Sequence, residues 1–370
     1  MDAQKFRDSI KKTGFFLEYR IGEVLRQQGW SVISNRYYVD DQSETVREID
    51  LVAYRTRVVQ DFTVYTVLLV SCKKTEKNIW AMLARDINPN DPNIDLRPVH
   101  LWTNKPVIHY MITQSSWREA YFKHAASQGV TTALAIPDVE VYAFQEMNKI
   151  SGAVQNDKPI FNSVTSLMKA QDYELSCLAS RKKDEAVYQF SLLSVVDADL
   201  IRMHLKGNDE VEAAEVESEN YIANYIINKE RTAARIHFVR ASAFPEVLQD
   251  YLALHDANCS FFNRLCNEFY ADALQDRRKM AIFEDEFRKR LQWPLSFAME
   301  RQTSESEDFG PVSLWWSEED ELLKIEVDLD EETIASLNQD AGLIKATRRI
   351  LRGLYRYKGR FEFAVYYIPF

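Results

Sequence analysis

The sequence predicts an α/β protein, in which a mixed sheet flanked by helices is followed by an α+β region. Over residues 1–150, apolar residues recur alternately with helical and with strand period, in the order α-β-β-β-α-β-α-β. Within that part, residues 67–70 form the continuous apolar run Val-Leu-Leu-Val, which is typical of a strand buried on both faces. After residue 150 the pattern changes to antiparallel strands and then to long helices.

The length of the chain and its changes of pattern predict several domains. A chain of 370 residues exceeds the size of one ordinary hydrophobic core. Residues 301–311 are polar and acidic and end in Gly-Pro, so they form the best linker in the chain. We therefore expect three domains, over residues 1–150, 151–300 and 311–370.

The composition is that of a folded protein, because 46% of the residues are hydrophobic and 28% are charged. The net charge of −10 argues against a uniformly basic surface for nucleic acid. Residues 1–150 are nearly neutral, however, with 19 Lys and Arg against 18 Asp and Glu. A local basic face in that region is therefore compatible with the total charge.

Cysteine usage and the length of the apolar runs indicate the compartment. None of the four cysteines lies in a CxxC pair, which argues against a disulfide framework or a zinc ribbon and favours a reducing cytoplasm. The N-terminal residues lack the apolar segment of a signal peptide, and no apolar run approaches the ~20 residues of a membrane helix. We expect a soluble, cytoplasmic protein without a membrane partner.

The N-terminal segment predicts a helix over residues 3–29, broken near Gly14 and ended by Gly29. Glu18 lies on or beside the apolar face of this helix. Two interpretations of Glu18 stay open. It is either a residue at the edge of the apolar face, whose carboxylate reaches solvent or an arginine, or a functional residue.

The rest of the first part predicts a meander of three strands and then alternating elements. The strands of the meander are expected over residues 30–39, 46–57 and 62–73. After them we expect a helix over 76–86, a loop over 88–98, a strand over 106–113, a helix over 115–128 and a short strand over 131–135.

The second half predicts a further sheet and long helices. We expect a helix over 164–180, a hairpin of 186–196 with 200–206, strands over 221–227 and 234–240, and helices through 242–300. The acidic run at 208–220 is most simply a solvated loop. Residues 312–370 predict the order strand, strand, helix, strand.

A polar segment ends the buried apolar run. Residues 71–74 read Ser-Cys-Lys-Lys, and alternate residues of a strand point to one face, so Ser71 and Lys73 emerge side by side. The neighbouring strand delivers Asp50 from among apolar residues. An acid and a lysine on adjacent strands predict a site that combines a metal ion with an ammonium group. A structural Asp50–Lys73 salt bridge is the alternative.

The order of these parts is similar to that of a known family. Glu18 lies eleven residues before Gly29, REID ends at Asp50, and VSCKK contains Lys73. Over roughly residues 12–145 this arrangement resembles the N-terminal nuclease domain of Mrr-type restriction endonucleases, which belong to the PD-(D/E)xK superfamily. The resemblance implies a restriction-endonuclease-like fold, metal-dependent cleavage of DNA, and a role in host defence against foreign DNA.

The resemblance also implies which groups act. Asp50, the main-chain carbonyl of Cys72 and, through water, Glu18 would bind Mg²⁺ or Mn²⁺. Lys73 would hold or deprotonate the attacking water, or stabilise the developing charge. Ser71 is a departure, because the family pattern has Glu, Asp or Gln two residues before the lysine. Glu48 and Glu76 are candidates for the missing acid.

Basic residues are expected to contact the DNA backbone. Lys74 and Lys77 follow the site strand, and residues 345–360 contain seven basic residues and no acid, with Arg348, Arg349 and Arg352 among them. A solvated helix face that pairs with the acidic segment 317–332 is the alternative for this second group.

A second class of function stays open beside the nuclease. In it, the same fold would lack catalysis and would grip DNA or a partner protein. A homodimer and a protein partner from the same defence system are further expectations of the nuclease interpretation.

Overall fold

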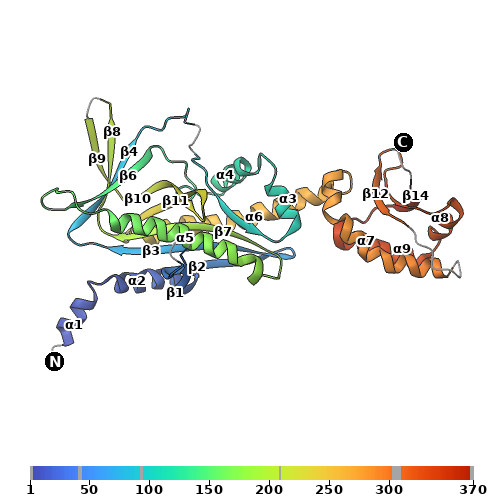
Figure 1. Cartoon of the computed structure of the whole chain (residues 1–370), viewed down its shortest axis with the longest axis horizontal. Helices are drawn as coiled ribbons and strands as arrows, with labels where there is room; N and C mark the ends of the chain where they lie inside the picture. The colour runs from blue at the N-terminus through green and yellow to red at the C-terminus, as the bar shows by residue number, and fades with distance from the viewer. Residues whose placement is uncertain (1–2, 41–43, 92–94, 208–209, 302–309, 367–370) are drawn as a thin grey trace. The chain divides into compact units, whose positions relative to one another are not determined.

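The computed structural model describes residues 3–40, 44–91, 95–207, 210–301 and 310–366 and divides into two compact units (Figure 1). The first unit comprises residues 1–105 and 115–263, and the second comprises residues 106–114 and 264–370. The α/β class expected from the sequence is confirmed, since mixed sheets are flanked by helices.

A large mixed sheet forms the core of the first unit. Its strands run in the order β1-β2-β3-β7-β11-β10, and β5 also pairs with β7. The strands are β1 (Ser31–Val39), β2 (Val46–Val59), β3 (Phe62–Lys74), β5 (His100–Thr103), β7 (Ala186–Asp197), β10 (Ser218–Ile227) and β11 (Glu230–Arg240). The three central strands β3, β7 and β11 are parallel to one another, and the other pairs are antiparallel.

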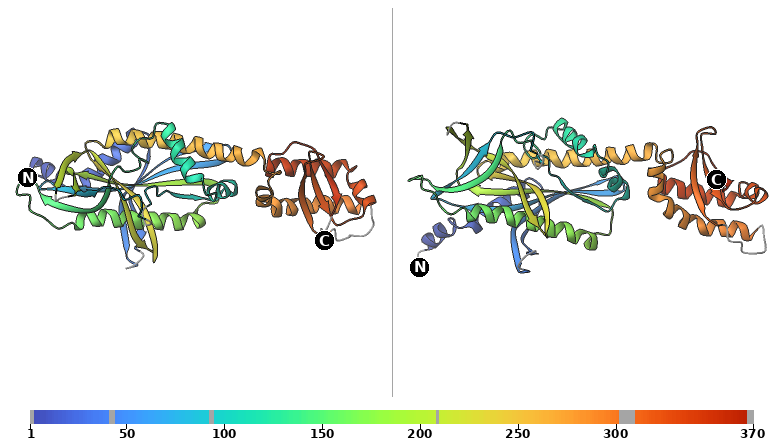
Figure 2. Two further views of the ribbon diagram at one scale, coloured as in Figure 1. Left: turned by 90° about the horizontal axis from the view of Figure 1, so that it is seen from above. Right: turned by 45° about the horizontal axis from the view of Figure 1, so that its top comes forward.

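Helices cover both faces of this sheet. Helix α5 (Lys158–Arg181) and the first-unit part of α6 (Phe244–Ala271) lie along opposite faces (Figure 2). The core on the α5 face includes Val52, Val67 and Leu69. Helix α2 (Gly14–Gln27) lies on the other face, because a Cβ at Gly22 would be 3.9 Å from Leu51 Cδ2 and successive strand residues point to opposite faces. Helix α1 (Ala3–Ile10) precedes α2, and α4 (Trp117–Ser127) bonds to α6 through Tyr121 Oη and Asn258 Oδ1 (2.7 Å).

A second sheet extends two strands of the first. Its order is β6-β4-β8-β9, with β6 (Glu140–Asn148), β4 (Asn78–Arg85), β8 (Leu200–Lys206) and β9 (Glu210–Val216). The parallel pair β3 and β7 continues, after short bends, as the parallel pair β4 and β8. The chain therefore continues in the same direction through residues 198–199 instead of turning back. The prediction of a hairpin at this point is wrong.

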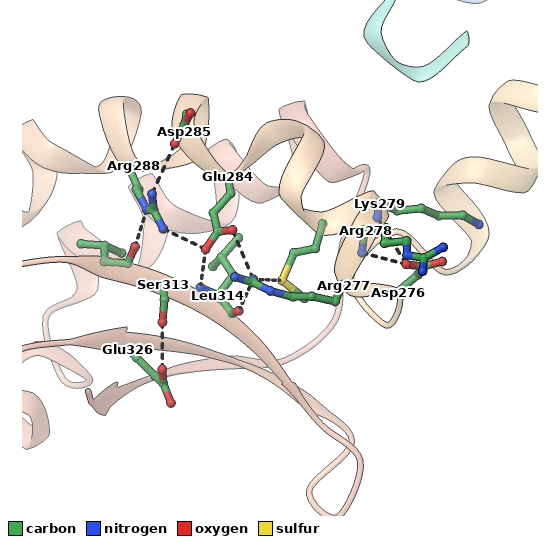
Figure 3. Close-up of polar contacts among 12 residues, drawn as sticks. Asp276, Arg277, Arg278, Lys279, Glu284, Asp285, Arg288, Ser313, Leu314 and Glu326 are labelled. Carbon is green, nitrogen blue, oxygen red and sulfur yellow. Dashed lines mark hydrogen bonds and ion pairs between the residues drawn. The ribbon is translucent and has the colours of Figure 1, made fainter. Parts of the chain in front are cut away.

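The second unit is a three-stranded sheet with helices. The strands β12 (Val312–Ser317), β13 (Leu322–Val327) and β14 (Phe361–Val365) pair in that order. Its helices are α3 (Pro106–Ile112), α7 (Arg277–Glu300), α8 (Glu331–Leu337) and α9 (Ala341–Tyr355). The buried Glu284 carboxylate ties α7 to β12, since it pairs with Arg277 (3.2 Å) and Arg288 (3.1 Å) and accepts from Leu314 N (Figure 3).

The domain boundary expected at residue 150 does not match the structure. Strands β7, β10 and β11 belong to the same sheet as β1–β3, so residues 151–263 complete the first unit. Local sequence patterns do not reveal this, because β3 and β7 pair across more than 100 residues of chain. Most of the linker expected at 301–311 lies outside the described residues.

Several elements also differ from the sequence prediction. Residues 76–86 form a strand instead of a helix, because pairing of β4 with two neighbours overrides the helix propensity of its Ala, Met and Leu residues. Residues 106–113 form α3 instead of a strand, and Pro106 occupies the first helical position, where its missing N–H costs nothing. No strand forms at 131–135, part of the acidic run is β9, and the tail contains two helices.

The described helices include none that is long and apolar enough to cross a membrane.

Candidate active site

The candidate site lies where β2 and β3 separate. Their ladder ends at the pair Leu51 and Val70, and beyond it β3 pairs only with β7. Asp50 occupies the gap, and its Oδ2 accepts a 2.6 Å hydrogen bond from Cys72 N. The carboxylate thus replaces the strand partner that this backbone N–H has lost.

Lys73 lies on the same face as Asp50, as strand parity predicted. Its Nζ is 3.3 Å from Asp50 Oδ2 and donates to the Cys72 carbonyl oxygen at the same distance. Ser71 is buried, and its Oγ lies 3.4 Å from Asp50 Oδ2. The two charged side chains remain partly exposed, at 29% for Lys73 and 19% for Asp50, so the pair is open to solvent.

Glu18 approaches this group from α2. Its burial and the neighbouring Asp50 carboxylate raise the pKa of Glu18 above its usual value of 4.5, and Lys73 opposes the shift. The pKa of the Cys72 thiol is raised as well, chiefly by burial and then by the negative charges of Asp50 and Glu18. The site therefore concentrates more negative charge than Lys73 alone offsets.

The candidate replacements for an acid at Ser71 differ in position. Glu48 lines the same cavity as Asp50 and Lys73, and Asn35 Nδ2 donates to its carboxylate. Asn35 lies in β1 between Ser34 and Arg36, which pair with Leu51 and Ile49 of β2, and it has a left-handed φ of 56°. Glu76 pairs with Lys74 at 3.9 Å and lines a different cavity. Of the two, Glu48 is the better placed.

The cavity beside Asp50 and Lys73 is polar and holds about 610 Å³. It lies between the sheet, α5 and β10, and its charged lining includes Asp40, which pairs with Lys169 (3.0 Å) and Arg47 (3.8 Å). A second cavity of about 490 Å³ shares Lys73 and Asn162 with the first and is lined by Lys158. Lys73 therefore stands where two cavities meet.

No motif in the sequence marks the further residues that line this cavity. Asp40 lies far along the chain from Asn162 and Lys169, and no motif joins the three. Polar residues spaced along one face of the helix over 158–181 would have been the available signal, since Asn162, Ser166 and Lys169 follow each other by three or four positions.

The donor set suits a hard cation in kind. Mg²⁺ commonly uses one or two carboxylates and completes its shell with water and phosphate oxygens, which Asp50, Glu18 and the Cys72 carbonyl would match. Among the residues that the structure describes, no group of three or more His, Cys, Asp or Glu is placed to hold a metal. The site thus lacks the closed ligand set of a structural zinc centre and offers at most the sparse protein shell typical of Mg²⁺.

The basic residues expected to contact DNA fall into two groups. The ammonium of Lys74 is half-buried and pairs with Asp197 at 2.9 Å, so a partner already neutralises it, whereas Lys77 is exposed. Arg348, Arg349 and Arg352 are exposed on α9, and Arg348 also lies over the Phe361 ring. Within the described part of the chain these three form no ion pair with the acidic segment 317–332, whereas Arg360 of the same basic group donates to the Asp320 carbonyl at 2.9 Å. Contact of the three arginines with phosphate stays a prediction.

Comparison of the chain with protein-family models, curated protein sequences and solved structures gave no match.

Proposed function

We propose that this chain is a metal-dependent endonuclease that hydrolyses phosphodiester bonds of DNA. The proposal rests on one observation. Asp50 and Lys73 lie 3.3 Å apart at the point where two strands separate, partly exposed to a polar cavity. Paired structural ions in a core are sealed from water, whereas a site for phosphate must admit both solvent and substrate.

The residues of the chain divide the work as follows. The Lys73 ammonium faces the cavity and balances negative charge that builds up on a phosphate oxygen. Glu18, whose pKa is raised, exchanges a proton more readily near neutral pH than an ordinary glutamate. When bound by Asp50, Glu18 and the Cys72 carbonyl, Mg²⁺ or Mn²⁺ would supply charge neutralisation and an acidified water.

Basic side chains that would contact a long polyanion lie among the acids that line the two cavities. The two cavities that meet at Lys73 extend to either side of it, with the exposed Lys158 in one and Arg47 in the other. In the second unit, the exposed arginines of α9 would make phosphate contacts of their own that do not depend on base sequence. A cytoplasmic location, a role in host defence, a homodimer and a protein partner from the same system complete the proposal.

One observation favours a second candidate, a DNA-binding module without catalysis. Asp50 Oδ2 already accepts from Cys72 N and Lys73 Nζ, and Ser71 stands where the nuclease pattern has an acid. A metal would therefore have to bind Asp50 through Oδ1 or compete with Lys73 for Oδ2.

Plasmid cleavage separates the two functions. Supercoiled DNA, both unmodified and methylated, is incubated with the protein and Mg²⁺, Mn²⁺ or EDTA. The endonuclease proposal expects nicked and linear DNA with either metal and none with EDTA. Retarded migration of DNA in a gel-shift assay without cleavage at any metal concentration would instead support the binding module.

A further inference from the structure

The large sheet of the first unit has a break beside β7, and a small cavity lies at this break. Along one edge, β7 pairs with β5 up to Phe190 and with β11 from Leu192. His100 of β5 bridges the two neighbours through a 2.9 Å contact of its Nε2 with the Ala233 carbonyl. The cavity offers about 20 Å³ to the centre of a water-sized sphere. One small occupant fits, since a single water needs about 10–15 Å³ of such space.

Three residues that line this cavity each carry a buried nitrogen atom with no hydrogen-bond partner among the described residues. These atoms are Nε of Arg235, Nε2 of His237 and Nε2 of Gln171. Their residues are 8%, 1% and 2% exposed. Buried polar atoms are rarely left without a partner, so three around one cavity indicate an occupant that accepts hydrogen bonds.

Arg235 also has no carboxylate paired with it among the described residues, although the charge of Asp95 acts on it from a distance. Its Nη1 and Nη2 donate to the main-chain carbonyls of Ala135 and Leu96. Desolvation by burial lowers the pKa of this guanidinium to about 10, which leaves it charged at neutral pH. Because a buried cation without a counter-charge is costly, an anion in the cavity would relieve it.

The acids nearest to this cavity are engaged elsewhere. Asp250 accepts from the backbone N–H groups of residues 131–133, and Asp95 pairs with Arg118 at 3.0 Å. His237 is neutral, because burial lowers its pKa to about 4, and its Nδ1 contacts Tyr251 Oη at 2.9 Å. When Tyr251 donates to Nδ1, the proton of the imidazole stays on Nε2 and faces the cavity.

We propose that this cavity is a binding site for a small monovalent anion of chloride size, held by Arg235, His237 and Gln171. The site is separate from Asp50 and Lys73 and does not depend on the proposed nuclease activity. The anion would fill the break between β5 and β11 and neutralise the guanidinium of Arg235, which β11 carries beside that break. Halide would therefore stabilise the folded state without taking part in chemistry.

The first test uses crystals of the full chain purified and grown in sodium bromide without chloride. We expect an anomalous bromide peak within hydrogen-bond distance of the three nitrogen atoms. Density for a water molecule alone, without anomalous signal, would overturn the proposal. In solution, replacing gluconate by up to 100 mM bromide at constant ionic strength should raise Tm in a saturating manner, by roughly 5 °C.

Variants connect the thermal response to the cavity. Gln171→Leu removes one donor but keeps the charge, and should shift the bromide midpoint about tenfold higher. If the Arg235→Met variant folds, bromide should no longer raise its Tm. If it does not fold, the test rests on the Gln171→Leu variant alone. The control Arg57→Gln removes an exposed arginine that pairs with exposed Asp256, and its response should equal that of the wild type. An equal bromide response in Gln171→Leu and the wild type would contradict the assignment.

Discussion

Replacing Lys73 by alanine should abolish DNA cleavage and leave the fold intact. The substitution removes the ammonium group that faces the cavity and breaks two contacts of 3.3 Å, with Asp50 Oδ2 and the Cys72 carbonyl. Asp50 keeps its 2.6 Å hydrogen bond from Cys72 N, so the backbone of the site retains its support.

The two effects differ greatly in size. The Lys73–Asp50 pair is 29% and 19% exposed, so water screens it, and such pairs contribute about 0–1 kcal/mol to stability. A loss of that size lowers Tm by at most about 4 °C. Removing a group that stabilises transition-state charge usually costs about 10²–10³-fold in rate, which corresponds to about 2.7–4 kcal/mol.

Plasmid nicking rates and thermal unfolding measured on the same preparations separate these effects. Lys324→Ala is a matched control, because Lys324 is 24% exposed and pairs with Asp320 at 2.9 Å outside the site. It should lose similar stability and no activity. Cleavage by Lys73→Ala at the wild-type rate would place the active site elsewhere, and its unfolding would make Lys73 a structural partner.

Three further predictions concern the metal, the proton and the DNA. Ser71→Glu puts a carboxylate into a buried position beside the site, so it should lower Tm in EDTA and give a larger Tm increase with Mg²⁺ than the wild type. The raised pKa of Glu18 means that its stability contribution is full below pH 4.5 and is lost as pH rises through the folded-state pKa. Glu18→Gln should therefore raise Tm at pH 7–8 and lose this advantage below about pH 4.5. Alanine at Arg348, Arg349 and Arg352 together should weaken DNA binding at all sequences and reduce the slope of log K against log salt by about 3.

Each of these predictions has a control of matched chemistry. Ser71→Gln has the size of glutamate without its charge, so a Mg²⁺ response equal to that of Ser71→Glu would exclude metal binding as the cause. Glu23→Gln removes an exposed helix glutamate that pairs with Arg26, and it should lack the pH dependence of Glu18→Gln. Arg290→Ala removes an arginine already paired with Glu286 at 2.7 Å, and it should leave the salt slope unchanged.

Local sequence patterns correctly predicted the elements that carry Glu18, Asp50 and Lys73. The period of apolar residues located α2, β1, β2 and β3, and Gly29 ends the helix region with a φ of 79°, which L-residues rarely adopt. Strand alternation then placed Asp50 and Lys73 on one face. These features depend on neighbours within a few residues, so they can be read without knowing the fold.

Other local patterns failed where distant partners decided the outcome. Residues 78–85 have helix-forming composition, yet they form a strand because β6 and β8 supply partners on both sides. The chain likewise does not turn back at 198–199, because β7 pairs in parallel with β3 and β8 pairs in parallel with β4. The preference of a short segment for helix over strand is smaller, in free energy, than the stabilisation that it gains by pairing along its length with two neighbouring strands.

The sequence by itself determined the class of fold, the first helix and meander, and the pairing of an acid with a lysine at the strand ends. Only the tertiary structure decided that β7 and β11 complete the same sheet, that α5 lines a cavity beside Asp50, and that Arg235 lines a small cavity at a break beside β7. The reason is physical. The period of apolar residues determines which face of a helix or strand a side chain lies on. Which other element packs against that face depends on the free energy of burying apolar surface between segments more than 100 residues apart in the chain.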